Sequence, residues 1–254
     1  MEIFNIIILA LIQGITEFLP ISSSSHLVLF SELTNYPDQG IGFDIALHAG
    51  SLLAVLIYFR NELKKILLLT HEGTQYLKLI IVASIPLPII GLIFIDYVSL
   101  YMRNMQSIAI MTILFALLLF FADKSRKDNK NIINCSLIVL IFIGLMQTLA
   151  IMPGVSRAGV VIMAALFIGF SRNDSIKIAF LLSIPAIFMA STYQSIQLLK
   201  ANDVFLFREY SLGIFFSFIF SYLTIKLFIS TINKISFAPY IIYRIILGSA
   251  LLIV

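Results

Sequence analysis

The sequence predicts an all-α integral membrane protein with about six transmembrane helices and two re-entrant helical hairpins. Three observations predict this class: 60% of the 254 residues are apolar, 12% are charged, and the mean hydropathy is +1.05. Soluble globular domains contain about 45–50% apolar and about 25% charged residues, so this chain belongs in lipid. We expect one membrane domain over residues 1–254, built from inverted repeats at about 1–122 and 133–254.

Long apolar stretches alternate with short polar connections along the whole chain. Two further apolar pieces, at about 21–31 and 158–170, are too short to span: at 1.5 Å per residue they cover roughly 16 and 20 Å of a hydrocarbon core of about 30 Å. Each of them must therefore turn back or stop midway. The longer stretches run at about 3–19, 43–59, 79–95, 108–122, 133–152, 176–199, 211–232 and 240–254.

Both short pieces follow a proline and small or hydroxyl residues, in the segments P-I-S-S from Pro20 and P-G-V-S from Pro153, about 133 residues apart. Broken backbone at membrane depth is tolerated only where protein buries it or where it lines a cavity, so a site is expected there. Three spanning segments follow each hairpin. Because three is odd, the second copy must be inverted, as in many secondary transporters.

The distribution of Lys and Arg predicts the orientation. If the first hairpin opens outward, eleven basic residues lie on the cytoplasmic side and three lie outside, which places the hairpin opening on the outer face. The eleven are Arg60, Lys64, Lys65, Lys78, Lys124, Arg126, Lys127, Lys130, Arg172, Lys177 and Lys234. The three are Arg103, Lys200 and Arg208.

Other features exclude several classes of protein. An acid at Glu2 stands where a secretory signal carries positive charge, so we expect the first segment to remain in the mature protein. The single cysteine, Cys135, excludes an internal disulfide and a cysteine metal cluster, and we interpret it as an apolar filler. The net charge of +4 comes from basic residues at segment ends, which does not favour nucleic acid as a partner.

The segment from Gln13 to His26 places an acid, four consecutive hydroxyls and an imidazole in this apolar chain. A charge at the bilayer centre costs about 2.5–3.5 kcal/mol on insertion scales, so such a residue indicates a functional site. Gln13 and Glu17 share a helix face. A carboxylate there suits a proton or a divalent cation, with Mg²⁺ favoured over Ca²⁺ because Mg²⁺ binds through few carboxylates plus substrate phosphates. The alternative is a neutral Glu17 that packs against a neighbouring helix.

The four serines supply hydroxyls and backbone N–H groups at the start of a short helix, where phosphate binds readily. The alternative for at least one of them is ordinary N-capping. His26 lies one turn further and can act as base, acid or phosphate ligand, or pack as a hydrogen-bonded residue. The serines are Ser22, Ser23, Ser24 and Ser25.

Arg157 is the only basic residue between Lys130 and Arg172, and it follows Gly154 and Ser156 at the opening of the second hairpin. A guanidinium binds phosphate oxygens bidentately, so these residues predict the other half of a phosphate site. The alternative is a salt bridge, which Glu17 could provide while substrate is absent.

Asp44 and His48, four residues apart, begin the third apolar segment on the predicted outer side. They either line the entrance of the site, next to the residues around Glu17 that contact substrate, or simply lie at the membrane interface. A lipid phosphatase of the acid-phosphatase type is excluded, because it requires a histidine six residues after Arg157, where this chain has Met163.

The segments Q-G-I-T-E-F-L-P-I-S-S-S-S-H-L and L-A-I-M-P-G-V-S-R-A-G closely resemble the two signature regions of the undecaprenyl-diphosphate phosphatases, the UppP or BacA family. The resemblance covers nearly the whole chain. It includes F-D-I-A-L-H-A-G from Phe43, V-A-S-I-P from Val82, F-L-L-S-I-P-A-I from Phe180 and Y-R-I-I-L-G from Tyr243.

The resemblance implies a multi-pass enzyme of the bacterial inner membrane that converts the polyprenyl diphosphate lipid to its monophosphate at the outer face. It also implies dependence on a divalent cation, a role in peptidoglycan synthesis, and bacitracin resistance. A homo-oligomer is compatible with the sequence. The matching motif positions are Gln13, Glu17, Ser23, His26, Pro153, Gly154, Ser156 and Arg157.

Three positions depart from the family pattern: Ser25 replaces a glycine, Ala158 a serine and Val161 a threonine. A lost hydrogen bond to a charged group is worth about 1.5–3 kcal/mol, so the departures bear on activity. The competing hypotheses are a carrier-lipid flippase with little or no phosphatase activity and an ion-coupled carrier with Glu17 as proton site. The nucleophile remains open between Ser23, with His26 as base, and water oriented by His26.

Overall fold

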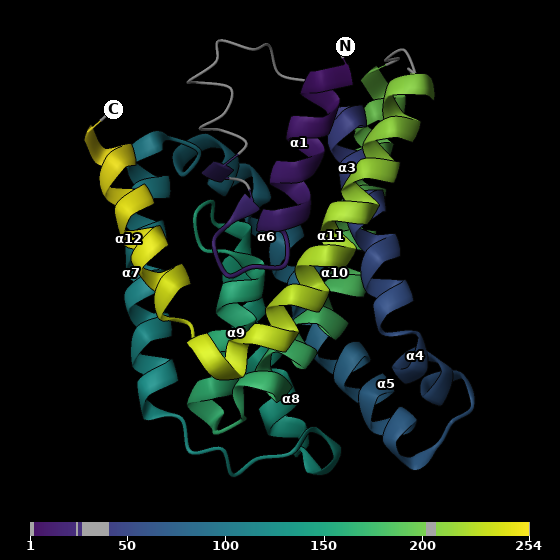
Figure 1. Ribbon diagram of the computed structural model, residues 1–254, viewed down its shortest axis with the longest axis vertical. Coiled ribbons are helices and arrows are strands. Elements are labelled where there is room, and N and C mark those ends of the chain that lie inside the picture. The colour runs from purple at the N-terminus through teal and green to yellow at the C-terminus, as the bar shows by residue number, and fades with distance from the viewer. Residues whose placement is uncertain (1–2, 24, 27–40, 202–206, 254) are drawn as a thin grey trace.

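The computed structural model describes residues 3–23, 25–26, 41–201 and 207–253, and every regular element in these ranges is helical (Figure 1). The expected all-α class is confirmed. The helices are α1 (Ile3–Thr16), α3 (Ile41–Tyr58), α4 (Arg60–Leu67), α5 (His71–Ser84), α6 (Pro86–Tyr101), α7 (Met105–Ser125), α8 (Leu137–Thr148), α9 (Arg157–Ile168), α10 (Arg172–Ala201), α11 (Phe207–Ile235) and α12 (Ala238–Ile253). Short 3₁₀ helices, η1 (Ile132–Asn134) and η2 (Leu149–Ile151), flank α8.

Within the described ranges, four helical segments are long and apolar enough to cross a membrane. The pair α3 and α4 makes a fifth if the 72° bend between them belongs to one span. Helices α1, α9 and α12 are apolar but shorter, and the 16 residues of α12 cover about 24 Å. The protein is therefore membrane-embedded, while the predicted number of six spans stays a prediction. The four segments are His71–Tyr101, Met105–Ser125, Arg172–Ile196 and Phe207–Ile235.

The first arms of the two expected hairpins, α1 and α8, enter from opposite ends of the molecule, and each is followed by a turn near its middle. Most of the short piece expected at about 21–31 lies outside the described residues. In Figure 1, α1 descends from the end that carries both termini, whereas α8 rises from the end near α4 and α5. The turns contain Ser22 with φ +71° and Ser156 with φ +69°. A non-glycine residue in this region costs about 1–3 kcal/mol and persists only where its surroundings impose it. The inverted repeat stays a prediction, and the matching turns support it.

Helix α9 forms the centre of the protein. Every residue from Ala158 to Leu166 is buried, and the helix packs against α7, α8 and α10. A helix that is apolar all round is stable only when it is enclosed by other elements. This enclosure fixes the N-terminus of α9, and with it Arg157, deep inside the bundle.

Small residues bring α3 and α11 into close contact. The hydroxyl of Ser51 lies 3.2 Å from that of Ser217 and 3.0 Å from that of Ser221, and all three serines are fully buried. A Cβ atom on Gly50 would lie only 2.4 Å from the carbonyl oxygen of Ile214. Small residues and hydroxyls of this kind commonly join membrane helices, because packing and polar contacts drive their association in lipid.

Ion pairs join the helix ends at the pole opposite both termini. Arg172 at the start of α10 donates two hydrogen bonds, of 2.7 and 2.8 Å, to the carboxylate of Asp123 near the end of α7. Lys177 of α10 lies 2.9 Å from the Glu62 carboxylate of α4. A bidentate pair between arginine and carboxylate fixes geometry as well as charge. These contacts tie α4, α7 and α10 together at this pole.

Replacing Gly50 by alanine is expected to destabilise the protein by about 1–3 kcal/mol, because the added methyl would force α3 away from α11. The thermal midpoint of the purified protein in detergent measures the effect. Gly91→Ala is the matched control, since the nearest atom to its new methyl would be 3.8 Å away. Equal midpoints for the two variants would contradict the close helix contact.

Candidate active site

A buried ion pair joins the two hairpins. The Nη2 atom of Arg157 donates to Oε1 of Glu17 at 2.6 Å, and the side chains are only 13% and 8% exposed. Arg157 also donates from Nη1 to the carbonyl oxygen of Ala179 at 3.2 Å, which orients the guanidinium against α10. Residues 140 positions apart are thus in direct contact, as the salt-bridge interpretation of the sequence allowed.

The second carboxylate oxygen of Glu17 accepts two hydrogen bonds from its own hairpin. Nε2 of Gln13 donates to Oε2 at 3.1 Å, and the Ser23 hydroxyl donates to the same oxygen at 3.1 Å. Gln13 is fully buried, and its Oε1 atom has no partner within the described residues. A buried carbonyl oxygen without a partner is costly, so this atom is a candidate ligand group.

His48 lies near the same carboxylate oxygen, Oε2 of Glu17. Its Nε2 atom is 3.8 Å from Oε2 of Glu17, and its Nδ1 atom donates to the backbone carbonyl of Asp44 at 2.8 Å. The carbonyl oxygen can only accept, so Nδ1 carries a proton and the ring orientation is fixed. The structure therefore brings His48 to the Glu17 cluster, with Asp44 holding it through the backbone.

The start of α9 faces this cluster. Ser156 is the N-cap residue, and its hydroxyl accepts from the Gly159 backbone N–H at 3.2 Å. Helix N-termini carry partial positive charge and N–H groups that favour anions. Since α9 begins at Arg157, the helix end and the guanidinium place positive charge in the same region.

The remaining predicted phosphate ligands have structural partners. The Ser25 hydroxyl donates to the Ser22 hydroxyl at 3.1 Å, and both residues are buried. Gly154, at φ +90°, would place a Cβ atom 2.4 Å from the Ile108 carbonyl oxygen, so close packing on α7 requires glycine there. Ser24 lies outside the described residues. Of the four serines, Ser23 is the one that contacts Glu17 among those described.

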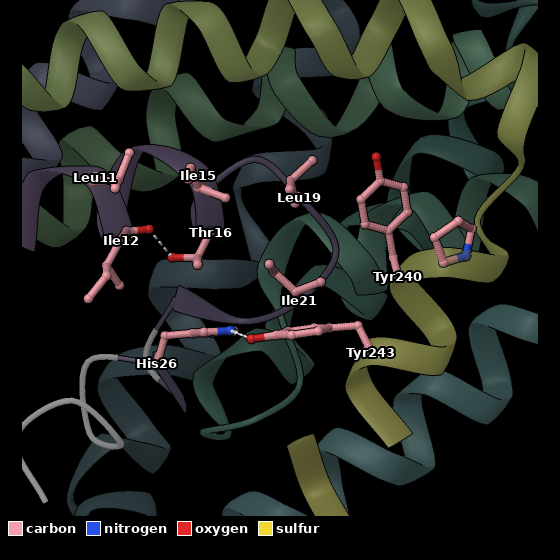
Figure 2. Close-up of a pocket in the computed structure, with 10 residues that line it drawn as sticks. Leu11, Ile12, Ile15, Thr16, Leu19, Ile21, His26, Tyr240 and Tyr243 are labelled. Carbon is pink, nitrogen blue, oxygen red and sulfur yellow. Dashed lines mark hydrogen bonds between the residues drawn. The ribbon is translucent and has the colours of Figure 1, made fainter. Parts of the chain in front are cut away.

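His26 points toward Tyr243 of α12 (Figure 2). Its Nδ1 atom lies 2.7 Å from the Ser22 carbonyl oxygen, which can only accept, so Nδ1 donates. In the neutral ring, Nε2 then accepts from the hydroxyl of Tyr243 at 2.6 Å. Both ring nitrogens are engaged, and neither contact involves the Ser23 hydroxyl. In this structure Glu17, and not His26, is positioned to accept the Ser23 proton.

Arg244 of α12 holds the two hairpin turns together. It is fully buried, and it donates to the carbonyl oxygens of Pro20 at 3.3 Å, Gly154 at 2.9 Å and Val155 at 3.1 Å. These carbonyls belong to broken backbone, and besides Arg244 the Gly154 carbonyl accepts only a long hydrogen bond, of 3.4 Å, from the Thr112 hydroxyl among the described residues. The motifs of the sequence predicted no role for Arg244. Its position as a lone charge in the apolar stretch 240–254 was the signal that could have identified it.

The two lost hydroxyls fall inside the core. Ala158 and Val161 are both buried on α9, and Val161 belongs to the main hydrophobic cluster of the protein. A methyl group at Val161 keeps the shape of a threonine side chain while removing its polar atom from this apolar surrounding. Apolar residues at these positions are thus compatible with the packing of α9.

The fold and the site define a class: a polytopic helical membrane protein in which two broken helices bring a carboxylate, a hydroxyl and a guanidinium together. Residues 6–250 match the family model described as "Bacitracin resistance protein BacA". The chain therefore belongs to the BacA family, as its motifs indicated.

Similar proteins carry the name undecaprenyl-diphosphatase. The relative from Teredinibacter turnerae is 42% identical over 265 residues, covering 100% of this chain and 99% of that protein. The relative from Saccharophagus degradans is 42% identical, with 99% and 97% covered, and that from Campylobacter concisus is 42% identical, with 99% and 98% covered. The similarity thus extends over the whole length of these proteins.

Substituting Arg244 by methionine should lower the thermal midpoint by at least about 5 °C, because each buried carbonyl left unpaired costs about 1–3 kcal/mol. The measurement is thermal unfolding in detergent. Arg208→Met, at an exposed position on α11, serves as the control for lost positive charge. If the Arg244 variant unfolded at the temperature of the control, Arg244 would not be holding the hairpins.

Proposed function

We propose that this protein hydrolyses undecaprenyl diphosphate to undecaprenyl phosphate and inorganic phosphate. The observation that carries the proposal is the 2.6 Å contact between Arg157 and Glu17, with the Ser23 hydroxyl on the other carboxylate oxygen. An anion-binding guanidinium, a base and a hydroxyl nucleophile are thereby assembled at one point. The name undecaprenyl-diphosphatase, carried by full-length relatives at 42% identity, supports the same reaction.

In the proposed mechanism Ser23 is the nucleophile and Glu17 is its base. The Ser23 oxygen attacks the terminal phosphorus while its proton passes to the Glu17 carboxylate, and the bond to the bridging oxygen breaks to release the lipid monophosphate. Glu17 passes this proton to the departing lipid monophosphate. Water then attacks the phosphorus of the phosphoserine while giving a proton to Glu17; the bond from phosphorus to the Ser23 oxygen breaks, that oxygen takes the proton back, and inorganic phosphate leaves. The 3.1 Å hydrogen bond from Ser23 to Glu17 already has the geometry that the first proton transfer requires.

Arg157 would neutralise the charge of the transferred phosphoryl group. Phosphoryl transfer depends mainly on positioning and charge stabilisation, so a fixed and largely buried guanidinium is well suited to it. When substrate enters, its phosphate oxygens would replace the Glu17 carboxylate as the partner of Arg157. This exchange would free Glu17 to act as base.

The residues around Glu17 also fit a divalent cation, which we propose as the cofactor. Gln13 Oε1 is a buried oxygen without a partner in the described residues, beside a carboxylate that also carries negative charge. Mg²⁺, or Ca²⁺ as the alternative, takes such oxygen ligands together with substrate phosphates. Glu17 and Gln13 would hold the cation. Bound there, it would add positive charge near the phosphate oxygens.

We further propose that the site opens to the outer face of the bacterial cytoplasmic membrane. The excess of Lys and Arg at the pole of α4 and α5 supports this orientation by the positive-inside rule. The product would be the carrier lipid for peptidoglycan synthesis. Consuming the diphosphate would counter its sequestration by bacitracin, in keeping with the family description.

Phosphate release by the purified protein, supplied with undecaprenyl diphosphate and Mg²⁺, tests the function. Glu17→Gln and Arg157→Lys should each lower turnover about 100-fold or more, because each removes a group acting on the transition state. Glu72→Gln in the first turn of α5 and Arg103→Lys in the connection between α6 and α7, both far along the chain from the two hairpins, are the matched controls. Unchanged turnover in both site variants would contradict the proposal.

The same preparation distinguishes the flippase hypothesis. Reconstituted in vesicles, a flippase would move the carrier lipid between leaflets without releasing phosphate. That outcome would replace hydrolysis as the activity of the site. A ³²P-labelled substrate should in contrast leave label on Ser23 in rapidly quenched samples, and label on any residue outside the two hairpins would overturn the mechanism.

Gln13→Leu should raise the Mg²⁺ concentration for half-maximal activity about tenfold or more, because it removes one oxygen of the proposed cation site. Binding of Mn²⁺, followed by electron paramagnetic resonance, should weaken in parallel. Gln147→Leu is a close control, since Gln147 is also fully buried with an unpartnered Oε1 atom. The same metal dependence in both variants would show that Gln13 holds no cation.

A further inference from the structure

An apolar groove lies beside the first hairpin, between residues of α1 and α12 (Figure 2). Its volume is about 470 Å³, within the range of about 300–1,000 Å³ that is typical of small-molecule sites. Leu11 and Ile15 of α1, with Leu19 in the turn that follows it, form one wall, and Tyr240 and Tyr243 of α12 form the other. The groove therefore opens between two helices that are far apart in the sequence.

The groove surface is suited to hydrocarbon. Thr16, one of its few polar lining residues, donates its hydroxyl to the Ile12 carbonyl at 2.7 Å, so that group is already satisfied. His26 and Tyr243 bond to each other, and their rings lie nearly parallel, at 7°. Apolar carbon can contact such paired groups without leaving hydrogen bonds unmade.

One end of the groove adjoins the reaction site. Ser23 and His26 are three residues apart and each has helical backbone, and residues at this spacing on a helix are neighbours with Cβ atoms about 5–6 Å apart. Ser23 contacts Glu17, whereas His26 lines the groove. A molecule whose phosphate lies at Ser23 thus has its remainder within reach of the groove, past the ring of His26.

We propose that this groove binds the isoprene units nearest the diphosphate of a polyprenyl diphosphate. The inference rests on the proposed function, and it adds the place where the hydrocarbon chain is held. Such a ligand is anionic at one end and branched hydrocarbon beyond it. Its anionic end matches the site of Arg157 and Ser23, and its hydrocarbon matches the adjoining apolar groove. Tyr243 and His26 stand where the two parts of this ligand join, so they contact the first isoprene unit.

The position of the groove also indicates a route of entry. Leu11 and Ile15 are 38% and 36% exposed, on the face of α1 that lies away from the buried Gln13. In a membrane-embedded protein such a surface meets lipid chains. A polyprenyl lipid can thus slide in sideways between α1 and α12 and bring its diphosphate to Ser23 without leaving the bilayer.

Chain-length dependence tests the groove. Ile15→Trp fills part of it, and removing even one methylene contact in an apolar pocket is worth about 10–200-fold in discrimination. The variant should therefore raise the KM for farnesyl diphosphate at least about tenfold while leaving hydrolysis of isopentenyl diphosphate unchanged. Ile242→Trp, at an exposed position on α12 that does not line the groove, is the matched control.

The outcomes separate this proposal from the proposed function. If the unmodified protein released no phosphate from any of these diphosphates, the function itself would fail. If it released phosphate but Ile15→Trp changed both substrates equally or neither, the groove proposal alone would fail.

Photolabelling provides a readout that does not depend on turnover. A farnesyl diphosphate analogue with a diazirine on its first isoprene unit should label the groove residues within 11–19 and 239–243. Undecaprenyl diphosphate should compete with this labelling, and phosphatidylglycerol should not. Equal competition by phosphatidylglycerol would assign the groove to ordinary bilayer lipid and would overturn the proposal. Labelling centred on Gly42 and Tyr210 would also overturn it, because these residues line a second pocket, of about 180 Å³, and the hydrocarbon chain would then bind there.

Discussion

The contact between Glu17 and Arg157 is the interaction on which the rest of the site depends. Taking two charges out of water costs several kcal/mol each, and their attraction offsets this only when the geometry is good and the remaining polar atoms are satisfied. Here Glu17 has Gln13 and Ser23 as further donors, and Arg157 has the Ala179 carbonyl as a further acceptor. The two hairpins must meet for this to happen, so the pair couples the fold to the chemistry.

Other contacts, which do not involve the Glu17 carboxylate, also hold the two hairpins together. Arg244 donates to carbonyls of both turns, and the strained Ser22 and Ser156 are held by the packing around them. Helix α9 is enclosed by its neighbours along its length. Backbone that is broken at membrane depth is thereby satisfied by protein, and the N-terminus of α9 keeps its positive end directed at the site.

Local patterns in the sequence predicted much of this arrangement. The apolar piece expected at 158–170 corresponds to α9 at Arg157–Ile168, and the expectation that this piece is too short to span followed from helix rise alone. The salt bridge between Glu17 and Arg157 was the alternative given for the role of Arg157, because opposite charges inside a membrane are stabilised by pairing with each other. The i and i+4 spacing of Gln13 and Glu17 predicted that they share a helix face, and the structure joins them by a hydrogen bond.

Contacts between distant segments could not be predicted in the same way. The partner of His26 is Tyr243, 217 residues away, and no periodicity connects them. The bend of 72° between α3 and α4 also lacks a proline or glycine at the break, where Phe59 stands. Arg244 was overlooked because one arginine near the end of an apolar stretch looks like an interface residue until its burial is known.

A double-mutant cycle on the unfolding free energy, measured without substrate in mixed micelles, tests most directly whether the ion pair joins the hairpins. Glu17→Gln and Arg157→Met should each be strongly destabilising, by about 3–5 kcal/mol, because each leaves a buried charge without its partner. The double variant should be clearly more stable than the sum of the two losses predicts. Losses that add within about 0.5 kcal/mol would show that the two residues are not coupled, and would contradict the account.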